Sequence, residues 1–93
     1  MTTLEALTAE FFVARLPRKH SPHTLDAYRR DIDLIAARLP ADVEQLTVPV
    51  LRGAFAGISY LAPATIARAW STWNQLLTFA VAEGVLPGNP MAG

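Results

Sequence analysis

Residues 21–40 read SPHTLDAYRRDIDLIAARLP, and their apolar side chains recur at steps of three and four residues. This spacing places the apolar residues on one face of an α-helix and most charged residues elsewhere. Ser21 followed by Pro22 suits a helix start, because the hydroxyl accepts a free backbone N–H and proline fits the first turn. Pro40 marks the end of the segment. The expected buried stripe of this second helix is Leu25, Tyr28, Ile32, Ile35 and Leu39.

Three further segments show helical periodicity, and none alternates with the period of a β-strand. The first helix is expected over residues 3–16, the third over 47–57 and the fourth over 63–83, with Pro17, Gly57 and Gly84 at their ends. The expected apolar stripe of the first is Leu4, Leu7, Phe11 and Ala14, and that of the fourth is Ile66, Trp70, Trp73, Leu77 and Ala80. Short connections between such helices predict an all-α fold, a compact four-helix bundle.

The composition fits one globular domain. The chain has 93 residues, of which 52% are hydrophobic and 17% charged. We expect the domain to cover residues 1–88 and a linker to start at 89–93, because residues 86–90 hold two prolines and a glycine. No basic leader and no long apolar stretch are present, which predicts a cytoplasmic protein without a membrane partner.

Several kinds of chemistry are excluded by residue content. The chain has no cysteine, so disulfides and thiolate metal sites are absent. The glycines are scattered and form no phosphate-binding loop. His20 and His23 have no acid at ligand spacing beside them. We therefore expect no catalytic residue, no metal and no cofactor within these residues, and no enzyme activity from them alone.

The charge is zero overall but unevenly distributed. Residues 15–30 contain five basic residues and one acid, and the basic side chains are Arg15, Arg18, Lys19, Arg29 and Arg30. Such a cluster is compatible with an anionic partner. Charge runs of this kind are more often solvated surface, so the cluster is only a weak indication of such a partner.

Two polar ridges are predicted on the helices. On the fourth helix, Thr65, Arg68, Thr72 and Gln75 recur at helical spacing opposite the tryptophans. On the second, Ser21 and Thr24 lie at the start, where free backbone N–H groups favour phosphate, and arginine adds bidentate donors. The candidate DNA-binding residues are Lys19, Ser21, Thr24, Arg29, Arg30, Thr65, Arg68 and Thr72. Whether these ridges are DNA contacts or solvated helix faces is left open by the pattern.

The chain resembles a known family at three places. Residues 21–32 resemble the opening motif of core-binding domains in tyrosine recombinases and phage integrases, including its tyrosine and aspartate, Tyr28 and Asp31. Residues 63–68, PATIAR, resemble the second block of these domains. Gly84 with Asn89-Pro90 is similar to the end of the domain.

The resemblance implies a SAM-like orthogonal bundle that forms one jaw of a clamp on recombination-site duplex DNA. Its second and fourth helices would face the major groove. Strand cleavage would belong to a separate catalytic domain of the same chain, and other recombinase protomers would be further partners. Tyr28 is expected to pack with its hydroxyl hydrogen-bonded.

Some positions depart from the family pattern. Ala62 stands where a serine usually caps the fourth helix, Asn74 replaces a frequent arginine, and Trp70 and Trp73 replace aliphatic residues. The alternative function is a helical protein-interaction module without nucleic-acid binding, for which Phe12 and Val13 lie off the main stripe. A helix-turn-helix regulator is disfavoured, because the connection between residues 57 and 63 exceeds its tight turn.

Overall fold

The computed structural model describes residues 2–15 and 22–92, and these residues form an all-α structure. The α-helices are α1 (Leu4–Arg15), α2 (Pro22–Ala36), α3 (Val48–Ala56) and α4 (Pro63–Ala82). Two short 3₁₀ turns, η1 (Val43–Gln45) and η2 (Pro90–Ala92), complete the described elements. The predicted all-α class is confirmed. The helix of residues 21–40 ends at Ala36, and a turn carries the chain on to Pro40.

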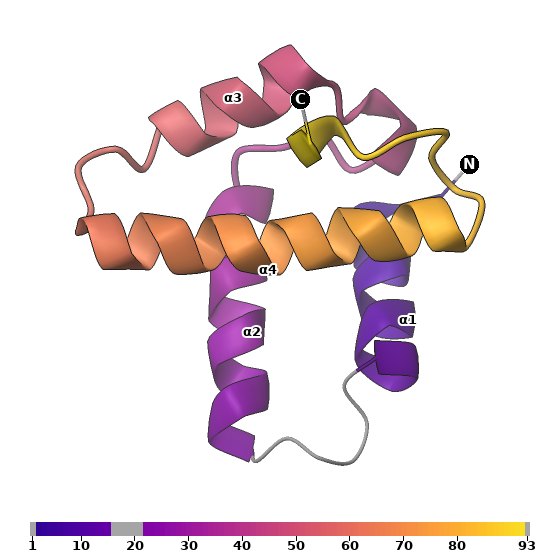
Figure 1. Cartoon of the computed structure of the whole chain (residues 1–93), viewed down its shortest axis with the longest axis horizontal. Helices are drawn as coiled ribbons and strands as arrows, with labels where there is room; N and C mark the ends of the chain where they lie inside the picture. The colour runs from indigo at the N-terminus through magenta and orange to yellow at the C-terminus, as the bar shows by residue number, and fades with distance from the viewer. Residues whose placement is uncertain (1, 16–21, 93) are drawn as a thin grey trace.

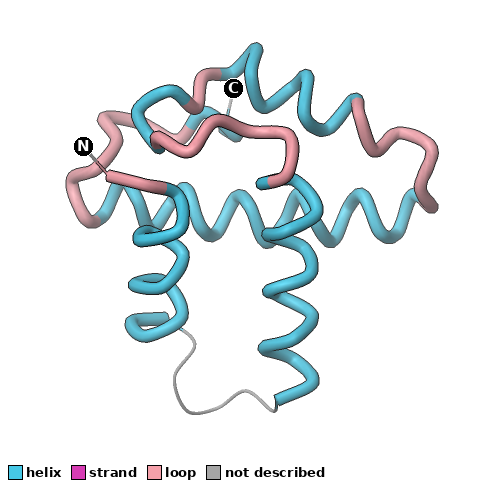
Figure 2. The backbone as a smooth tube through the Cα atoms, turned by 180° about the vertical axis from the view of Figure 1, so that it is seen from behind, coloured by secondary structure: helices cyan, strands magenta, loops and turns pink. Residues whose placement is uncertain are grey.

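The helices form two crossed layers (Figure 1). α1 and α2 lie side by side, and α4 runs across both of them. α3 lies beyond the C-terminal end of α2, and the C-terminal segment passes between α3 and α4. Figure 2 shows the same arrangement from behind, with the N-terminal residues beside the loop that follows α2. This is the orthogonal bundle that the resemblance implied.

The core lies where α4 meets the other helices. Trp73 is fully buried at the centre, together with Ile32 and Ile35 of α2 and Leu76 and Leu77 of α4. Trp70, expected in the same stripe, is 46% exposed, so that expectation is wrong. The physical reason is that α2 packs against α4 at Trp73, whose indole N–H donates to the Asp31 carbonyl, while Trp70 borders a hollow lined largely by α3.

On α1 the buried stripe stops at Phe11, whose ring lies 5.7 Å from that of Phe79 on α4. Ala14, expected to continue the stripe, is exposed.

Local hydrogen bonds define the helix ends. The hydroxyl of Thr3 accepts the backbone N–H of Ala6 at 3.1 Å, and that of Thr47 accepts the N–H of Val50 at 3.4 Å. Ala62 offers no side-chain cap to α4. At the other end of α4, Gly84 adopts φ +76°, a conformation that favours glycine. It closes the helix with backbone bonds from residues 84 and 85 to the carbonyls of residues 81 and 80.

The C-terminal segment is packed against the bundle. Leu86 and Met91 are buried. The side-chain amide of Asn89 donates to Asn74 Oδ1 at 2.9 Å and to Thr78 Oγ1 at 3.0 Å, and its Oδ1 accepts the N–H of Met91 at 2.8 Å. The position at which we expected a linker to start therefore lies inside a segment that contacts α4. In the described part of the chain, none of the helices combines the length and apolar character needed to span a bilayer.

Candidate nucleic-acid interface

A groove between α2 and α4 gathers polar side chains from both helices. It encloses about 390 Å³. Its lining residues are His23, Thr24, Ala27, Tyr28 and Asp31 from α2, and Arg68, Ser71, Thr72 and Gln75 from α4. The steps of three and four residues on each helix explain why one face of each supplies the lining. Of the predicted contacts, the groove brings together Thr24, Arg68 and Thr72.

Asp31 is the central residue of this groove and is only 3% exposed. Its Oδ1 accepts the Nε–H of Arg68 at 3.3 Å, and its Oδ2 accepts the hydroxyl of Thr72 at 3.0 Å. Its backbone carbonyl accepts the indole N–H of Trp73 at 3.1 Å. A buried carboxylate requires such partners, because an unpaired charge is costly away from water. The motif aspartate therefore ties α2 to α4.

Arg68 differs sharply from its partner in exposure. Its side chain is 56% exposed, whereas that of Asp31 is 4% exposed. Arginine has five N–H donors, and the contact to Asp31 uses the one on Nε. Within residues 2–15 and 22–92, the structure shows no other ion pair of this guanidinium. Donors on its two terminal nitrogens thus remain for a ligand.

The polar ridge predicted on the fourth helix requires exposed side chains, but Thr72 does not face solvent. It is 3% exposed, and its hydroxyl is used by Asp31. The expectation of an exposed Thr72 is wrong because α2 crosses α4 over this position. Thr65 lies half-buried in the first turn of α4, about two helical turns before Thr72.

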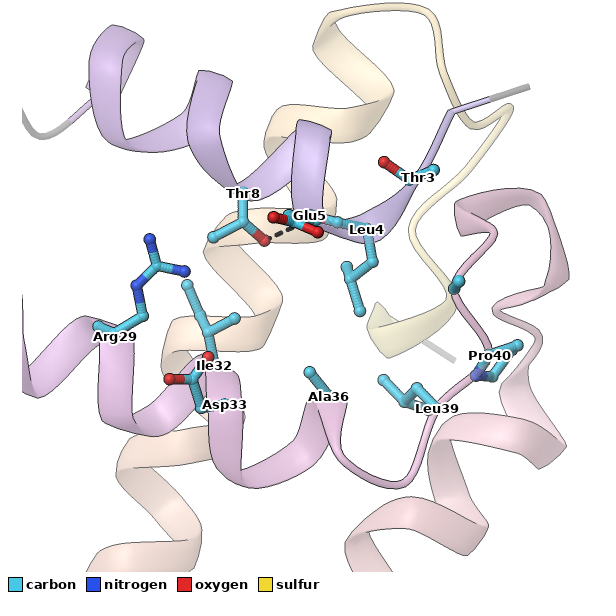
Figure 3. A pocket seen from close by; sticks show the side chains of 11 residues that line it. Thr3, Leu4, Glu5, Thr8, Arg29, Ile32, Asp33, Ala36, Leu39 and Pro40 are labelled. Atoms are coloured by element: carbon cyan, nitrogen blue, oxygen red, sulfur yellow. Dashed lines mark hydrogen bonds between the residues drawn. The ribbon is translucent and has the colours of Figure 1, made fainter.

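Neither of the two arginines of α2 lines this groove. The guanidinium of Arg29 lies 4.9 Å from the centre of the Phe12 ring on α1. It borders a second hollow of about 540 Å³ between α1 and α2, which also exposes the carboxylates of Glu5 and Asp33 (Figure 3). Two acids beside one base make that hollow a poor site for a polyanion. Arg30 is exposed and does not line either hollow.

Two other predicted contacts, Lys19 and Ser21, lie outside the described residues, as do Arg18 and His20. The groove residues His23 and Ser71 belonged to neither of the polar ridges predicted from the sequence. The helical spacing of the sequence would have identified both residues. His23 lies four residues before Ala27, and Ser71 lies three after Arg68, so each shares a face with a groove residue. Among the described residues, no cluster of three or more histidine or acidic side chains could hold a metal ion.

Comparisons with known proteins show the family to which the chain belongs. The family described as "Phage integrase, N-terminal SAM-like domain" matches residues 10–84, which include α2, α4 and the whole groove. The tyrosine recombinase XerC of Chromobacterium violaceum is 37% identical over 76 residues. The match covers 78% of this chain and 25% of that relative, so the chain spans about a quarter of the relative's length. No solved structure matches the chain.

Proposed function

Since this chain belongs to the phage integrase N-terminal SAM-like domain family, we propose that it binds duplex DNA of a recombination site through the groove between α2 and α4. The observation that carries the proposal is the half-exposed Arg68, whose acidic partner is buried beneath it. Arginine with free terminal donors suits both phosphate oxygens and the guanine edge in the major groove.

The other polar groups that line the groove support the same ligand. The hydroxyls of Thr24 and Ser71 and the amide of Gln75 are short polar groups of the kind that bind phosphates and base edges. Asp31 is the one carboxylate in the lining, and it is covered by its partners. Thr65 and Arg30 extend the proposed contact surface beyond the groove.

The charge of the groove limits the affinity we expect. Arg68 and Asp31 cancel each other at long range, so we attribute the added attraction to Arg18, Lys19 and Arg30, with Ser21 as a further proposed contact. Binding by this domain alone should resemble non-specific binding, with a Kd of about 10⁻⁴ to 10⁻⁶ M at physiological salt.

The domain's place in a longer protein is part of the proposal. The N-terminal SAM-like domain is a non-catalytic domain of tyrosine recombinases. We propose that this chain grips DNA as one jaw in the cytoplasm while a catalytic domain of the same recombinase exchanges the strands. Neighbouring protomers on the same DNA would be its other partners.

The test is fluorescence anisotropy of the domain titrated onto short duplex DNA at several salt concentrations. The logarithm of the affinity should fall with that of the salt concentration, by about 0.9 for each neutralised phosphate. Arg68→Ala should weaken binding roughly 5- to 100-fold, the range of a lost arginine contact. Arg52→Ala, an exposed arginine on α3 that lies outside the groove, is the matched control. Equal affinities for the two variants would refute the assignment.

A protein-interaction module remains the second candidate, because a second surface favours it. Trp70 is 46% exposed, and it borders an open apolar hollow with Leu61, Pro63, Ile66 and Ala67. Phe12, which first indicated this alternative, is covered in part by Arg29, while Val13 is exposed. Absence of DNA binding even at low salt would favour this candidate.

A further inference from the structure

We propose that Asp31 is a positioning residue that holds the guanidinium of Arg68 in the orientation that binds DNA. The inference rests on the proposed function. It starts from the burial of Asp31 and from the fact that both carboxylate oxygens and the backbone carbonyl accept hydrogen bonds from α4. A carboxylate that served only to neutralise Arg68 would need just one of these bonds.

The three bonds restrict Asp31 at three points. The indole of Trp73, which is fully buried, holds its backbone carbonyl at 3.1 Å. The hydroxyl of Thr72 holds Oδ2 at 3.0 Å, which fixes the plane of the carboxylate. The remaining oxygen, Oδ1, is then presented to Arg68 Nε at 3.3 Å. The orientation of an exposed arginine is thereby set from the core of the domain.

Fixing an arginine before it binds has a physical consequence. A free arginine samples many rotamers and loses them when it contacts a ligand, which reduces the affinity. Because Arg68 is held through Nε, part of its rotamer freedom is already lost when the domain folds and is not lost again on binding. The contact leaves both terminal nitrogens available for a bidentate interaction.

Electrostatics and positioning predict opposite effects for Asp31→Asn. The substitution removes a negative charge next to the proposed DNA site, and Coulomb's law alone predicts tighter binding. It also leaves a single acceptor oxygen for two donors, Arg68 Nε and the hydroxyl of Thr72. If positioning dominates, the arginine is released and binding weakens. The sign of the change therefore separates the two effects.

The experiment measures DNA affinity for the wild type, Asp31→Asn, Arg68→Ala and the double variant by anisotropy, at a temperature where urea unfolding shows each to be folded. We expect Asp31→Asn to weaken binding about three- to tenfold, and the double variant to match Arg68→Ala within about twofold, as for coupled residues. Asp33→Asn is the control. It changes the charge equally on the same helix, but Asp33 is exposed and lies outside the groove. It should bind as the wild type or slightly tighter.

A second measurement covers the case in which Asp31→Asn fails to fold. Arg68→Lys keeps the charge at an exposed side chain and lacks Nε, so it should weaken binding with an unchanged salt slope. In nitrogen-resolved NMR spectra of the free wild type, the Nε–H of Arg68 should exchange slowly with water, as expected for a proton donated to Asp31.

The outcomes separate the two proposals. Wild-type affinity for Arg68→Ala would refute the proposed DNA contact itself. Weakened binding by Arg68→Ala, with unchanged or tighter binding by Asp31→Asn, would overturn only the positioning role. A rapidly exchanging Nε–H, or wild-type affinity for Arg68→Lys, would also overturn that role.

Discussion

Asn89 should hold the C-terminal segment on the bundle, and Asn89→Ala tests this. The side chain takes part in hydrogen bonds with Asn74 Oδ1, Thr78 Oγ1 and the backbone N–H of Met91, at 2.9, 3.0 and 2.8 Å. A fourth contact, to the backbone carbonyl of Asn74, is longer at 3.4 Å. The amide has two hydrogens, so it makes two good bonds as donor and one as acceptor.

The magnitude follows from these bonds and from Met91. A net contribution of about 0.5–1.5 kcal/mol for each hydrogen bond, taken near its lower end because the site is partly exposed, gives a loss of roughly 2 kcal/mol. If η2 also detaches, Met91 loses its burial, which adds about 1.5–3 kcal/mol. The free energy of unfolding should therefore fall by about 2 kcal/mol if η2 stays in place and by up to about 5 kcal/mol if it detaches.

The assay is urea unfolding followed by circular dichroism, with amide exchange of Met91 as the local probe. Its N–H should exchange faster in Asn89→Ala, because its acceptor is gone. Thr78→Val removes one of the three bonds and should cost only about 0.5–1 kcal/mol. A loss below about 0.5 kcal/mol for Asn89→Ala, the usual range of a neutral surface change, would refute the reasoning.

Three further predictions concern single residues. Gly84→Ala should lower the free energy of unfolding by about 1–2 kcal/mol, because its φ of +76° disfavours a side chain, and a urea midpoint that stays in place would contradict this. Backbone N–H groups of Glu44 and Thr2 lower the pKa of the Glu44 carboxyl. The carboxylate therefore contributes its full stabilisation at pH values above the ordinary pKa of glutamate, and this stabilisation is lost as the pH falls through the lowered pKa. If an NMR titration gave Glu44 an ordinary pKa, the contact with these N–H groups would be absent. Fluorescence should distinguish the tryptophans: Trp70→Phe leaves the blue-shifted emission of buried Trp73, and Trp73→Phe leaves the red-shifted emission of exposed Trp70.

The helix positions were predictable because their signals are local. Thr47 caps α3 as expected, Pro63 begins α4, and Gly84 ends it with a positive φ. These features depend on neighbours within about five residues, so they can be predicted from the order of residues in the sequence. The all-α class followed from the same signals.

Which side chains face the core and which face solvent was less predictable, since this depends on where the helices cross. Both Trp70 and Trp73 fit an apolar stripe on α4, yet only Trp73 lies under the crossing. Thr72 fits a polar ridge equally well, but α2 covers it and Asp31 accepts its hydroxyl. Arg29 stands next to a groove residue in the sequence and contacts Phe12 instead. None of these outcomes can be read from one helix alone.

The ion pair that Asp31 of α2 forms with Arg68 of α4 has a consequence for how the sequence evolves. Asp31 and Arg68 lie 37 positions apart in the chain, yet each is the other's ion-pair partner. A mutation of Arg68 alone would leave a buried carboxylate with a lost partner, and a mutation of Asp31 alone would release the arginine. Descendants of a common ancestor should therefore keep both residues or exchange both. We therefore expect selection to act on the two positions together, although each belongs to a different helix.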